Sequence, residues 1–486
     1  MSGCTRLLVV TAFAVASSPA FAHDPPEVMR IAWPAPQSAV FQTQRGFIVG
    51  DTEARSYRWA CVEGLEAALG EQPGFVVLPG DVWMVATERG LRTSSDQGCH
   101  WNAVERFGAQ VASAVALAPD DSKHVFVALA GAADGGLFES RDAGASWQKR
   151  MHLAPDDYVA QILIAPSEPA QIYLSGLVID EQADRFSFQI TRSSDAGATW
   201  ERTFVPLAPD EDQAVLAAVS PTHPTQLLVL ARNHRWGEQQ DRVLFSDDAG
   251  ATYRELTRAI KLTGAAFSSD GAAIIVAGSD SLSRIELTTD AAASSEPIGM
   301  SQMLSCAQPG PAGLYACGHV NGYDPLVYGA SVSMDDGKSF RSLMSFTEVK
   351  ERVACANEAF AKACSDQWLD WQLEILVGLG GASIDSVEGW MDFKGIPEVE
   401  HPAAAHTLST ARRSATSDAA DAGSEPAAAA DGGASLSGER EVAAKTDAAG
   451  CQSSASGSAS GAAWGLLSLL AMASRRIRRA RVTVTS

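Results

Sequence analysis

The sequence predicts an all-β fold built from repeated units of four strands, and three observations support this prediction. A phrase with the frame Ser-x-Asp-x-Gly-x-x-aromatic occurs five times. Its aspartates in the first four copies are 46, 53 and 53 residues apart, a length that accommodates four short strands and their turns. The residues before the copies alternate as in a strand, for example in Arg242-Val243-Leu244-Phe245.

Each copy of the phrase has the composition of a tight hairpin turn. Ser and Asp side chains can hydrogen-bond the backbone N–H groups of their own turn, and Gly supplies the positive φ that other residues resist. The aromatic residue is the first of the next strand that can reach a core. We expect these residues to hold turns together. They are Ser94, Asp96, Gly98 and Trp101; Ser140, Asp142, Gly144 and Trp147; Ser193, Asp195, Gly197 and Trp200; Ser246, Asp248, Gly250 and Tyr253; and Ser333, Asp335, Gly337 and Phe340.

The phrase resembles the Asp-box, or bacterial neuraminidase (BNR) repeat, and the resemblance covers roughly residues 30–347. It implies a β-propeller of the sialidase and sortilin-like superfamily, with the phrase at the turn between the two outer strands of a blade. The gap of 87 residues between Asp248 and Asp335 fits two blades, one without the phrase. We expect seven blades over residues 23–347, with six as the alternative. Because an open ring leaves unpaired edges, we expect the N-terminal segment to pair with the last blade.

The N-terminus has the pattern of a secretory signal peptide over residues 1–22. Arg6 gives a positive start, residues 7–16 are largely apolar, and Ala20-Phe21-Ala22 is a small-x-small cleavage site. The mature chain would begin at His23. We therefore expect an exported protein.

Export makes disulfides the expected state of the cysteines in the folded part. These are Cys61, Cys99, Cys306, Cys317, Cys355 and Cys364. Six cysteines allow fifteen pairings, so the sequence does not fix the connectivity. The local pairs Cys306–Cys317 and Cys355–Cys364 are plausible and leave Cys61–Cys99 to join neighbouring blades. A zinc site is the rival interpretation, but it lacks a CxxC spacing, and we expect neither a metal nor a cofactor.

Residues 348–400 predict a small helical appendix, because residues 348–378 lose the alternation of strands and show apolar residues at helical spacing. On one unbroken helix Cys355 and Cys364 would lie about 13 Å apart, too far for a disulfide. Either a turn separates two helices there, or each cysteine bonds elsewhere. Residues 401–450 consist mainly of Ala, Ser, Gly, Asp and Glu, the composition of a disordered linker.

The last segment, residues 451–486, contains Cys451, a short apolar stretch and a cluster of five arginines. The apolar stretch is shorter than the roughly 20 residues that a full transmembrane helix prefers, and the arginines would stay cytoplasmic. This arrangement resembles the myxobacterial C-terminal sorting signal (MYXO-CTERM). The resemblance implies cleavage near Cys451, lipid modification of that cysteine and display at the cell surface or outer membrane. An uncut transmembrane tail anchor is the alternative.

The sequence contains few residue patterns that indicate a catalytic site. The stretch Met29-Arg30-Ile31-Ala32 echoes the opening of sialidases, and Tyr315, Tyr323 and Tyr328 are late tyrosines of the kind their nucleophile requires. The other residues of such a site cannot be placed, and the expected blade count exceeds the six of sialidases. We therefore assign no catalytic residue and expect Arg30 to be an ordinary strand residue. Residues 233–236, Asn-His-Arg-Trp, form a loop that could face a ligand.

The net charge of −21 argues against nucleic acid as a partner. We expect a cell-surface binding or scaffold module for an extracellular protein, peptide or glycan, in contact with the membrane through its C-terminal segment. A secreted sialidase-like or other glycoside-acting hydrolase is the alternative. Converging arginines with a carboxylate pair in the central channel would favour the enzyme, and a lining of apolar or Gly and Ser residues would favour binding.

Overall fold

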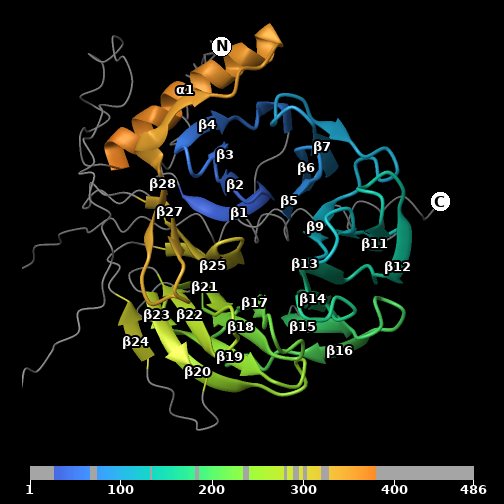
Figure 1. The fold of residues 1–486 in the computed structure, drawn as a ribbon. Coiled ribbons are helices and arrows are strands. Elements are labelled where there is room, and N and C mark those ends of the chain that lie inside the picture. The colour runs from blue at the N-terminus through green and yellow to red at the C-terminus, as the bar shows by residue number, and fades with distance from the viewer. Residues whose placement is uncertain are drawn as a thin grey trace, which may run out of the picture. The chain divides into compact units, whose positions relative to one another are not determined.

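A computed structural model describes residues 27–65, 74–131, 134–180, 185–233, 240–278, 282–287, 295–298, 304–318 and 328–378. They form a seven-bladed β-propeller followed by an α-helix (Figure 1). The all-β prediction and the count of seven blades, against six, are confirmed. The predicted signal peptide, the linker and the segment of residues 451–486 lie outside the described residues.

Each blade is an antiparallel sheet whose four own strands follow one another in sequence, the first lying nearest the axis of the ring (Figure 1). Blades 1 to 3 contain β1 (Val28–Ala35), β2 (Ser38–Thr43), β3 (Gly46–Asp51) and β4 (Ser56–Ala60); β5 (Phe75–Leu78), β6 (Val82–Thr87), β7 (Gly90–Ser94) and β8 (Asn102–Ala103); and β9 (Ala112–Leu117), β10 (Val125–Leu129), β11 (Gly136–Ser140) and β12 (Gln148–His152). Blades 4 and 5 contain β13 (Asp157–Ile164), β14 (Ile172–Asp180), β15 (Arg185–Ser193) and β16 (Glu201–Phe204); and β17 (Gln213–Val219), β18 (Leu227–Arg232), β19 (Gln240–Ser246) and β20 (Arg254–Ile260). Blades 6 and 7 contain β21 (Leu262–Phe267), β22 (Ala273–Gly278), β23 (Leu282–Glu286) and β24 (Ser295–Ile298); and β25 (Leu304–Gly310), β26 (Gly313–Gly318), β27 (Tyr328–Ser333) and β28 (Arg341–Ser345).

The repeated phrase forms the turn between the third and fourth strands of five blades. In every copy the Ser hydroxyl accepts the N–H of the Gly four residues on, and the Asp Oδ1 accepts, at 2.8 Å, the N–H of the residue four positions further. The residue before each Gly has a φ of 56–60°, as Ala196 does at 57°, and Gly197 follows at 86°. Two consecutive residues with positive φ explain why this position needs Gly.

The core consists of apolar clusters between neighbouring blades, and the aromatic residue of each phrase packs on the cluster shared with the preceding blade. Trp147 of blade 3, for example, lies against Phe107 and the cluster that contains Met84 of blade 2. Phe340 of blade 7 is buried against Ile275 and Ala277 of blade 6. The phrase therefore also joins one blade to the next.

The ring closes through the C-terminal side of the chain. Strand β29 (Val349–Arg352) pairs in parallel with β4 and makes blade 1 five-stranded. The prediction that the N-terminal segment pairs with the last blade is wrong, since β1 pairs with β2 and blade 7 is complete without it. After β28 the 3₁₀ helix η2 (Phe346–Glu348) turns the chain, with a capping box between Ser345 and Glu348. The chain then covers the edge of β4, which would otherwise be unpaired.

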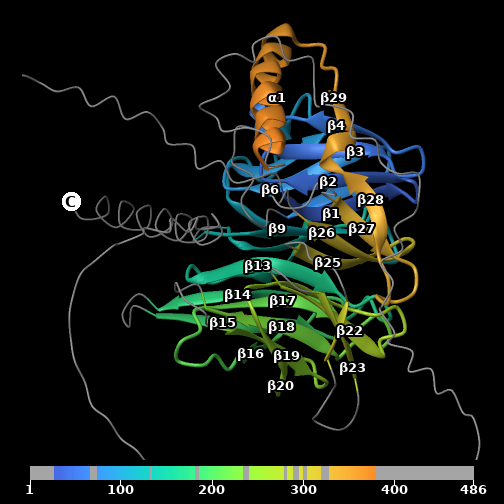
Figure 2. The ribbon, with the colours of Figure 1, turned by 90° about the vertical axis from the view of Figure 1, so that its left-hand side faces the viewer.

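The described part of the predicted appendix, residues 348–378, is α-helical only in its C-terminal portion. Helix α1 covers only Glu358–Gly378, and the residues before it include η2 and β29. Figure 2 shows α1 beside β4, at the outer rim of the ring. Trp371, 1% exposed, lies on Trp59 of β4 with ring centroids 6.2 Å apart, so the helix packs through its aromatic side chains. Residues 379–400 lie outside the described part of the chain.

Three disulfides are formed, and one pairing matches the expectation. Cys306 bonds Cys317 across the hairpin of β25 and β26. The pairs Cys61–Cys99 and Cys355–Cys364 are wrong, because Cys61 bonds Cys364 and Cys99 bonds Cys355. Cys355 lies before α1 and Cys364 within it, so each reaches a different blade. Of the two predicted alternatives, the structure shows the one in which each cysteine bonds elsewhere.

Candidate functional site: the innermost strands

Seven strands surround the axis of the ring, one from each blade: β1, β5, β9, β13, β17, β21 and β25 (Figure 1). Their residues are mainly small or apolar, as in Ala112–Leu117 and Gln213–Val219. Within these seven described strands Arg30 is the one basic residue and Asp157 the one acidic residue. Arg202 donates to Asp157 at 2.7 Å, so this carboxylate is already paired.

Six of these strands contain a bulge, where the pairing with the second strand skips one residue. The bulge lies in the first half of five of these strands and near the C-terminal end of β17. A bulge bends the strand and changes the direction of the side chains beside it. In each of these six strands one residue directly follows the skipped position. These residues are Arg30, Ala114, Gln161, Ala218, Gly264 and Cys306.

Close approach between blades explains why glycine stands at two positions in or beside the innermost strands. A Cβ on Gly264 would lie 2.6 Å from the backbone nitrogen of Ala307 in blade 7. A Cβ on Gly74 would lie 2.3 Å from the backbone nitrogen of Val115 in blade 3. The inner strands therefore pack with backbone against backbone at these two junctions, where only glycine fits.

Arg30 is the one charged residue among these six described positions. Its side chain is partly exposed, and burial lowers the pKa of its guanidinium from the ordinary value. It pairs across the sheet with Gln42 of β2, which is 1% exposed. The sequence alone marks Arg30 only through its resemblance to a sialidase opening and gives no signal for Gln42.

Tyr315, one of the tyrosines considered for a sialidase-like site, does not lie beside Arg30. Tyr315 is buried in blade 7, its hydroxyl accepts the N–H of Ala312, and its ring lies 4.7 Å from that of Trp33. Trp33 and Ile31 pack toward blade 7, whereas Arg30 alternates to the other face of β1. Tyr328 begins β27, and Tyr323 lies outside the described residues. Of the three tyrosines, Tyr315 is the one whose side chain the structure describes.

The predicted ligand-facing loop is described only at its start. The N–H of Asn233 donates to the Asp241 carboxylate at 2.9 Å, and the second oxygen of Asp241 accepts the N–H of Leu262. Asp241 is buried and fixes the connection between blades 5 and 6. Residues 234–236 lie outside the described residues.

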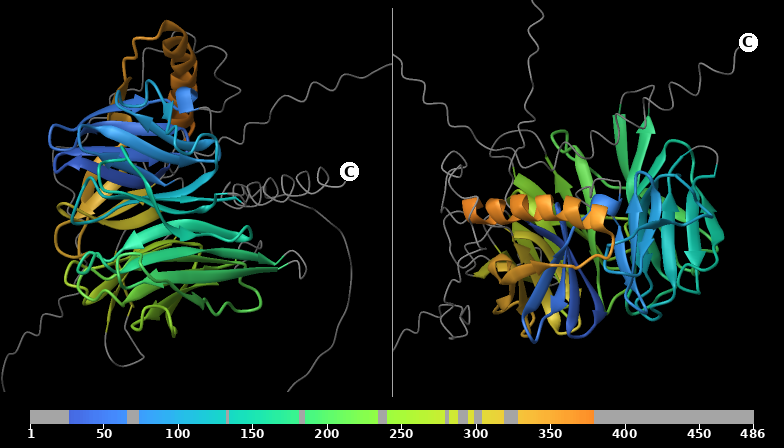
Figure 3. Two further views of the ribbon diagram at one scale, coloured as in Figure 1. Left: turned by 90° about the vertical axis from the view of Figure 1, so that its right-hand side faces the viewer. Right: turned by 90° about the horizontal axis from the view of Figure 1, so that it is seen from above.

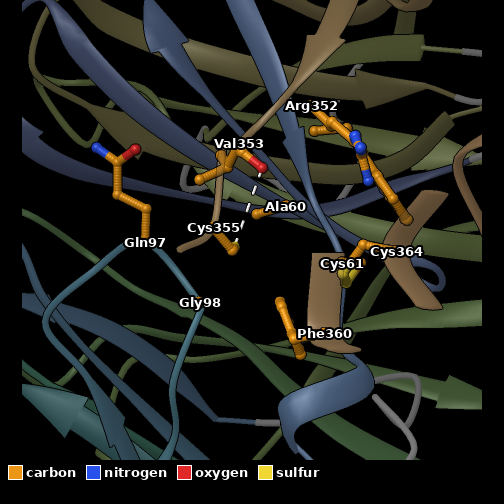
Figure 4. A pocket seen from close by; sticks show the side chains of 10 residues that line it. Ala60, Cys61, Gln97, Gly98, Arg352, Val353, Cys355, Phe360 and Cys364 are labelled. Carbon is orange, nitrogen blue, oxygen red and sulfur yellow. Dashed lines mark hydrogen bonds between the residues drawn. A yellow bond between two sulfur atoms is a disulfide. The ribbon is translucent and has the colours of Figure 1, made fainter. Parts of the chain in front are cut away.

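A small cavity lies where α1 meets blades 1 and 2 (Figure 4). Both bridging disulfides reach it, together with Trp59, Gln97, Arg352 and Phe360. It has room for about one water molecule. The cavity is therefore part of the joint between the helix and the ring.

Two features of the described ranges bear on metals and membranes. Among the described residues, no three His, Cys, Asp or Glu side chains gather in a way that could hold a metal ion. The same residues include no helix that is both long and apolar enough to cross a membrane.

The turn aspartates predict a loss of stability in acid. A hydrogen bond from the Thr199 hydroxyl is the main cause that lowers the pKa of Asp195 to about 2, and Ser146 does the same for Asp142. Because these pKa values lie below the ordinary 3.8, the carboxylates stabilise the fold above about pH 4, and this contribution is lost as the pH falls toward 2. We expect Asp195→Asn to lower the melting temperature at pH 7 and to make its decrease between pH 4 and 2 shallower.

Thermal unfolding at a series of pH values measures this effect. Asp120→Asn, in an exposed loop outside the turns, is the control and should keep the wild-type profile. A variant Asp195→Asn whose melting curve follows the wild type at every pH would contradict the role of this carboxylate.

Neither a known protein-family model nor a curated protein matches the sequence. Solved structures resemble the fold. A GH74 enzyme from Niastella koreensis is 13% identical with a TM-score of 0.44, over 65% of this chain and 56% of that one. An ancestral GH74 enzyme is 13% identical with a TM-score of 0.44, over 66% of this chain and 50% of that one. The GH74 xyloglucanase from Xanthomonas campestris is 16% identical with a TM-score of 0.39, over 68% of this chain and 69% of that one. The match spans about half the length of the first two, and we infer no activity from this likeness.

Proposed function

We propose that this chain is an exported Asp-box β-propeller that acts at the cell surface as a binding or scaffold module for an extracellular protein, peptide or glycan. The observation that carries the proposal is the make-up of the innermost strands. Small and apolar residues fill them, and their two charged residues, Arg30 and Asp157, belong to blades 1 and 4. A ring built in this way offers surfaces and loops for binding.

The disulfides support the extracellular location. Two disulfides, Cys61–Cys364 and Cys99–Cys355, join residues that are 303 and 256 positions apart. Disulfides form and persist in oxidising compartments. Together with the predicted signal peptide, they favour a protein that folds after export.

The position of α1 supports display from the C-terminal side. Seen from above, the helix lies across the outer rim of the ring, between its two faces (Figure 3). The chain continues from α1 toward the predicted linker and sorting signal. Because α1 lies at the rim, this helix covers neither face of the propeller.

Two experiments on the exported protein test the proposal. Labelling intact cells with a membrane-impermeant reagent should modify the propeller, and protection of the propeller in intact cells would contradict surface display. The purified protein should bind a component in glycan-array or surface pull-down experiments and should not hydrolyse a panel of fluorogenic sialosides and other glycosides. Turnover that is lost in Arg30→Met or Asp157→Asn would instead establish the glycoside hydrolase.

A further inference from the structure

Two polar side chains project from neighbouring strands at the inner edge of blade 1. Arg30 on β1 lies directly opposite Gln42 on β2 in the antiparallel register. Residues directly opposite one another share a face of the sheet, and their Cβ atoms are about 4.5–5.5 Å apart. Ala32 and Val40, the next pair on this face, pack against the cluster shared with blade 2. The guanidinium and the amide therefore extend from one patch of the face toward blade 2.

Neither side chain has a partner among the residues that the structure describes. Gln42 is 1% exposed, and both its Nε2 and its Oε1 lack a hydrogen bond. Arg30 forms no hydrogen bond or ion pair within the described ranges, and burial is the one cause that shifts its pKa. Arg242 behaves differently, since its guanidinium holds the buried Glu211 carboxylate through two nitrogens.

The chemistry of Arg30 and Gln42 indicates which kind of hydrogen-bond partner these side chains lack. A guanidinium has five N–H donors and no acceptor, and the amide adds two more donors. Buried polar groups in native proteins are hydrogen-bonded in the great majority of cases. The positive charge of Arg30 is also less well solvated than in water, as the direction of its pKa shift indicates. A negatively charged acceptor would accept hydrogen bonds from the guanidinium and from the amide nitrogen of Gln42.

The surroundings limit the size of this acceptor. Gln42 is closed off from solvent, and Ala32 and Val40 fill the neighbouring positions with apolar groups. Arg30 keeps part of its surface open. An ion that contacts both groups must therefore be small.

We propose that Arg30 and Gln42 bind a small monovalent anion, of the size of chloride or formate, at the inner edge of blade 1. This inference goes beyond the proposed function and does not depend on it. The anion neutralises Arg30, which is the one basic residue in the described innermost strands, and connects β1 with β2. Its binding contributes to the stability of the ring by mass action.

Thermal unfolding of the purified exported protein tests the proposal. Sodium chloride replaces sodium gluconate stepwise at constant ionic strength, gluconate being too large for the site. We expect the melting temperature to rise by about 2–4 °C with chloride. Arg30→Met should abolish this rise and Gln42→Leu should weaken it. Arg192→Met is the matched control, because it also removes one positive charge, from an exposed pair with Glu201, and should keep the chloride dependence.

The proposal is overturned if Arg30→Met and Arg192→Met respond to chloride alike. Crystals of the wild-type protein grown in bromide give a second test that does not require the variants to fold. An anomalous peak in contact with both side chains is the expected result. A water molecule at that position, or a direct hydrogen bond from Arg30 to the Gln42 carbonyl with no anion, contradicts it.

Discussion

Replacing Cys61 and Cys364 by serine should lower the free energy of unfolding by about 4 kcal/mol. This disulfide and Cys99–Cys355 are nested, so with the inner pair intact the outer one closes an effective loop of about 47 residues. In the chain-entropy model a loop of this length corresponds to about 4 kcal/mol. Removing both disulfides also releases the loop of 256 residues, and the total loss rises to about 9–10 kcal/mol.

The third disulfide provides the control for this prediction. Cys306–Cys317 closes a hairpin with a separation of 11 residues, so its removal should cost only about 3 kcal/mol. Urea denaturation of the three sets of serine variants measures the differences. If removing both bridging pairs costs no more than removing the hairpin pair, the C-terminal segment does not hold the ring closed.

Trp371→Ala should be the most damaging single substitution in helix α1, with a loss of about 3–5 kcal/mol. The Trp371 ring stacks on Trp368 with centroids 5.1 Å apart and also meets Trp59 of β4 and Phe346 of η2. Alanine would leave a cavity between the helix and blade 1, because Trp371 is 1% exposed. The midpoint of urea denaturation, measured with the disulfides intact, reports this loss.

Leu369→Ala is the matched control on the same helix. Leu369 is 57% exposed, so its truncation should change the stability by less than about 0.5 kcal/mol. Equal losses in the two variants would show that α1 does not dock through its aromatic residues.

The blades could be predicted from the sequence because their signal is local. The turn of the repeated phrase is determined by four residues and its own backbone hydrogen bonds, and Ser140, Asp142 and Gly144 show this within a few positions. The blade of β21–β24 lacks the phrase but is still visible as apolar strands such as Ala273–Gly278. Local chemistry therefore predicted seven blades.

The closure of the ring could not be predicted in this way. Strand β29 is four residues long with the sequence Val-Lys-Glu-Arg, and apart from Val349 it has no signature of a strand. Its pairing depends on the edge of β4, which lies about 290 residues away in the sequence. The disulfide connectivity depends on the same docking, since Cys355 and Cys364 reach their partners only when β29 and α1 are in place.

The surroundings of Arg30 in the candidate site also could not be predicted from the sequence. The sequence indicates a strand residue, and the structure places it opposite Gln42 only through the register of β1 and β2, which includes a bulge. The lack of partners for the two side chains is a property of the packed blades. Neither the register nor the packing is encoded by a motif.

Peptide mapping of the exported protein without reduction tests the central claim most directly, namely that the C-terminal segment closes and clamps the ring. Mass spectrometry should find Cys61 linked to Cys364, Cys99 to Cys355 and Cys306 to Cys317. Peptides that link Cys61 to Cys99 and Cys355 to Cys364 would contradict the account, because the C-terminal segment would then carry no covalent bond to the blades.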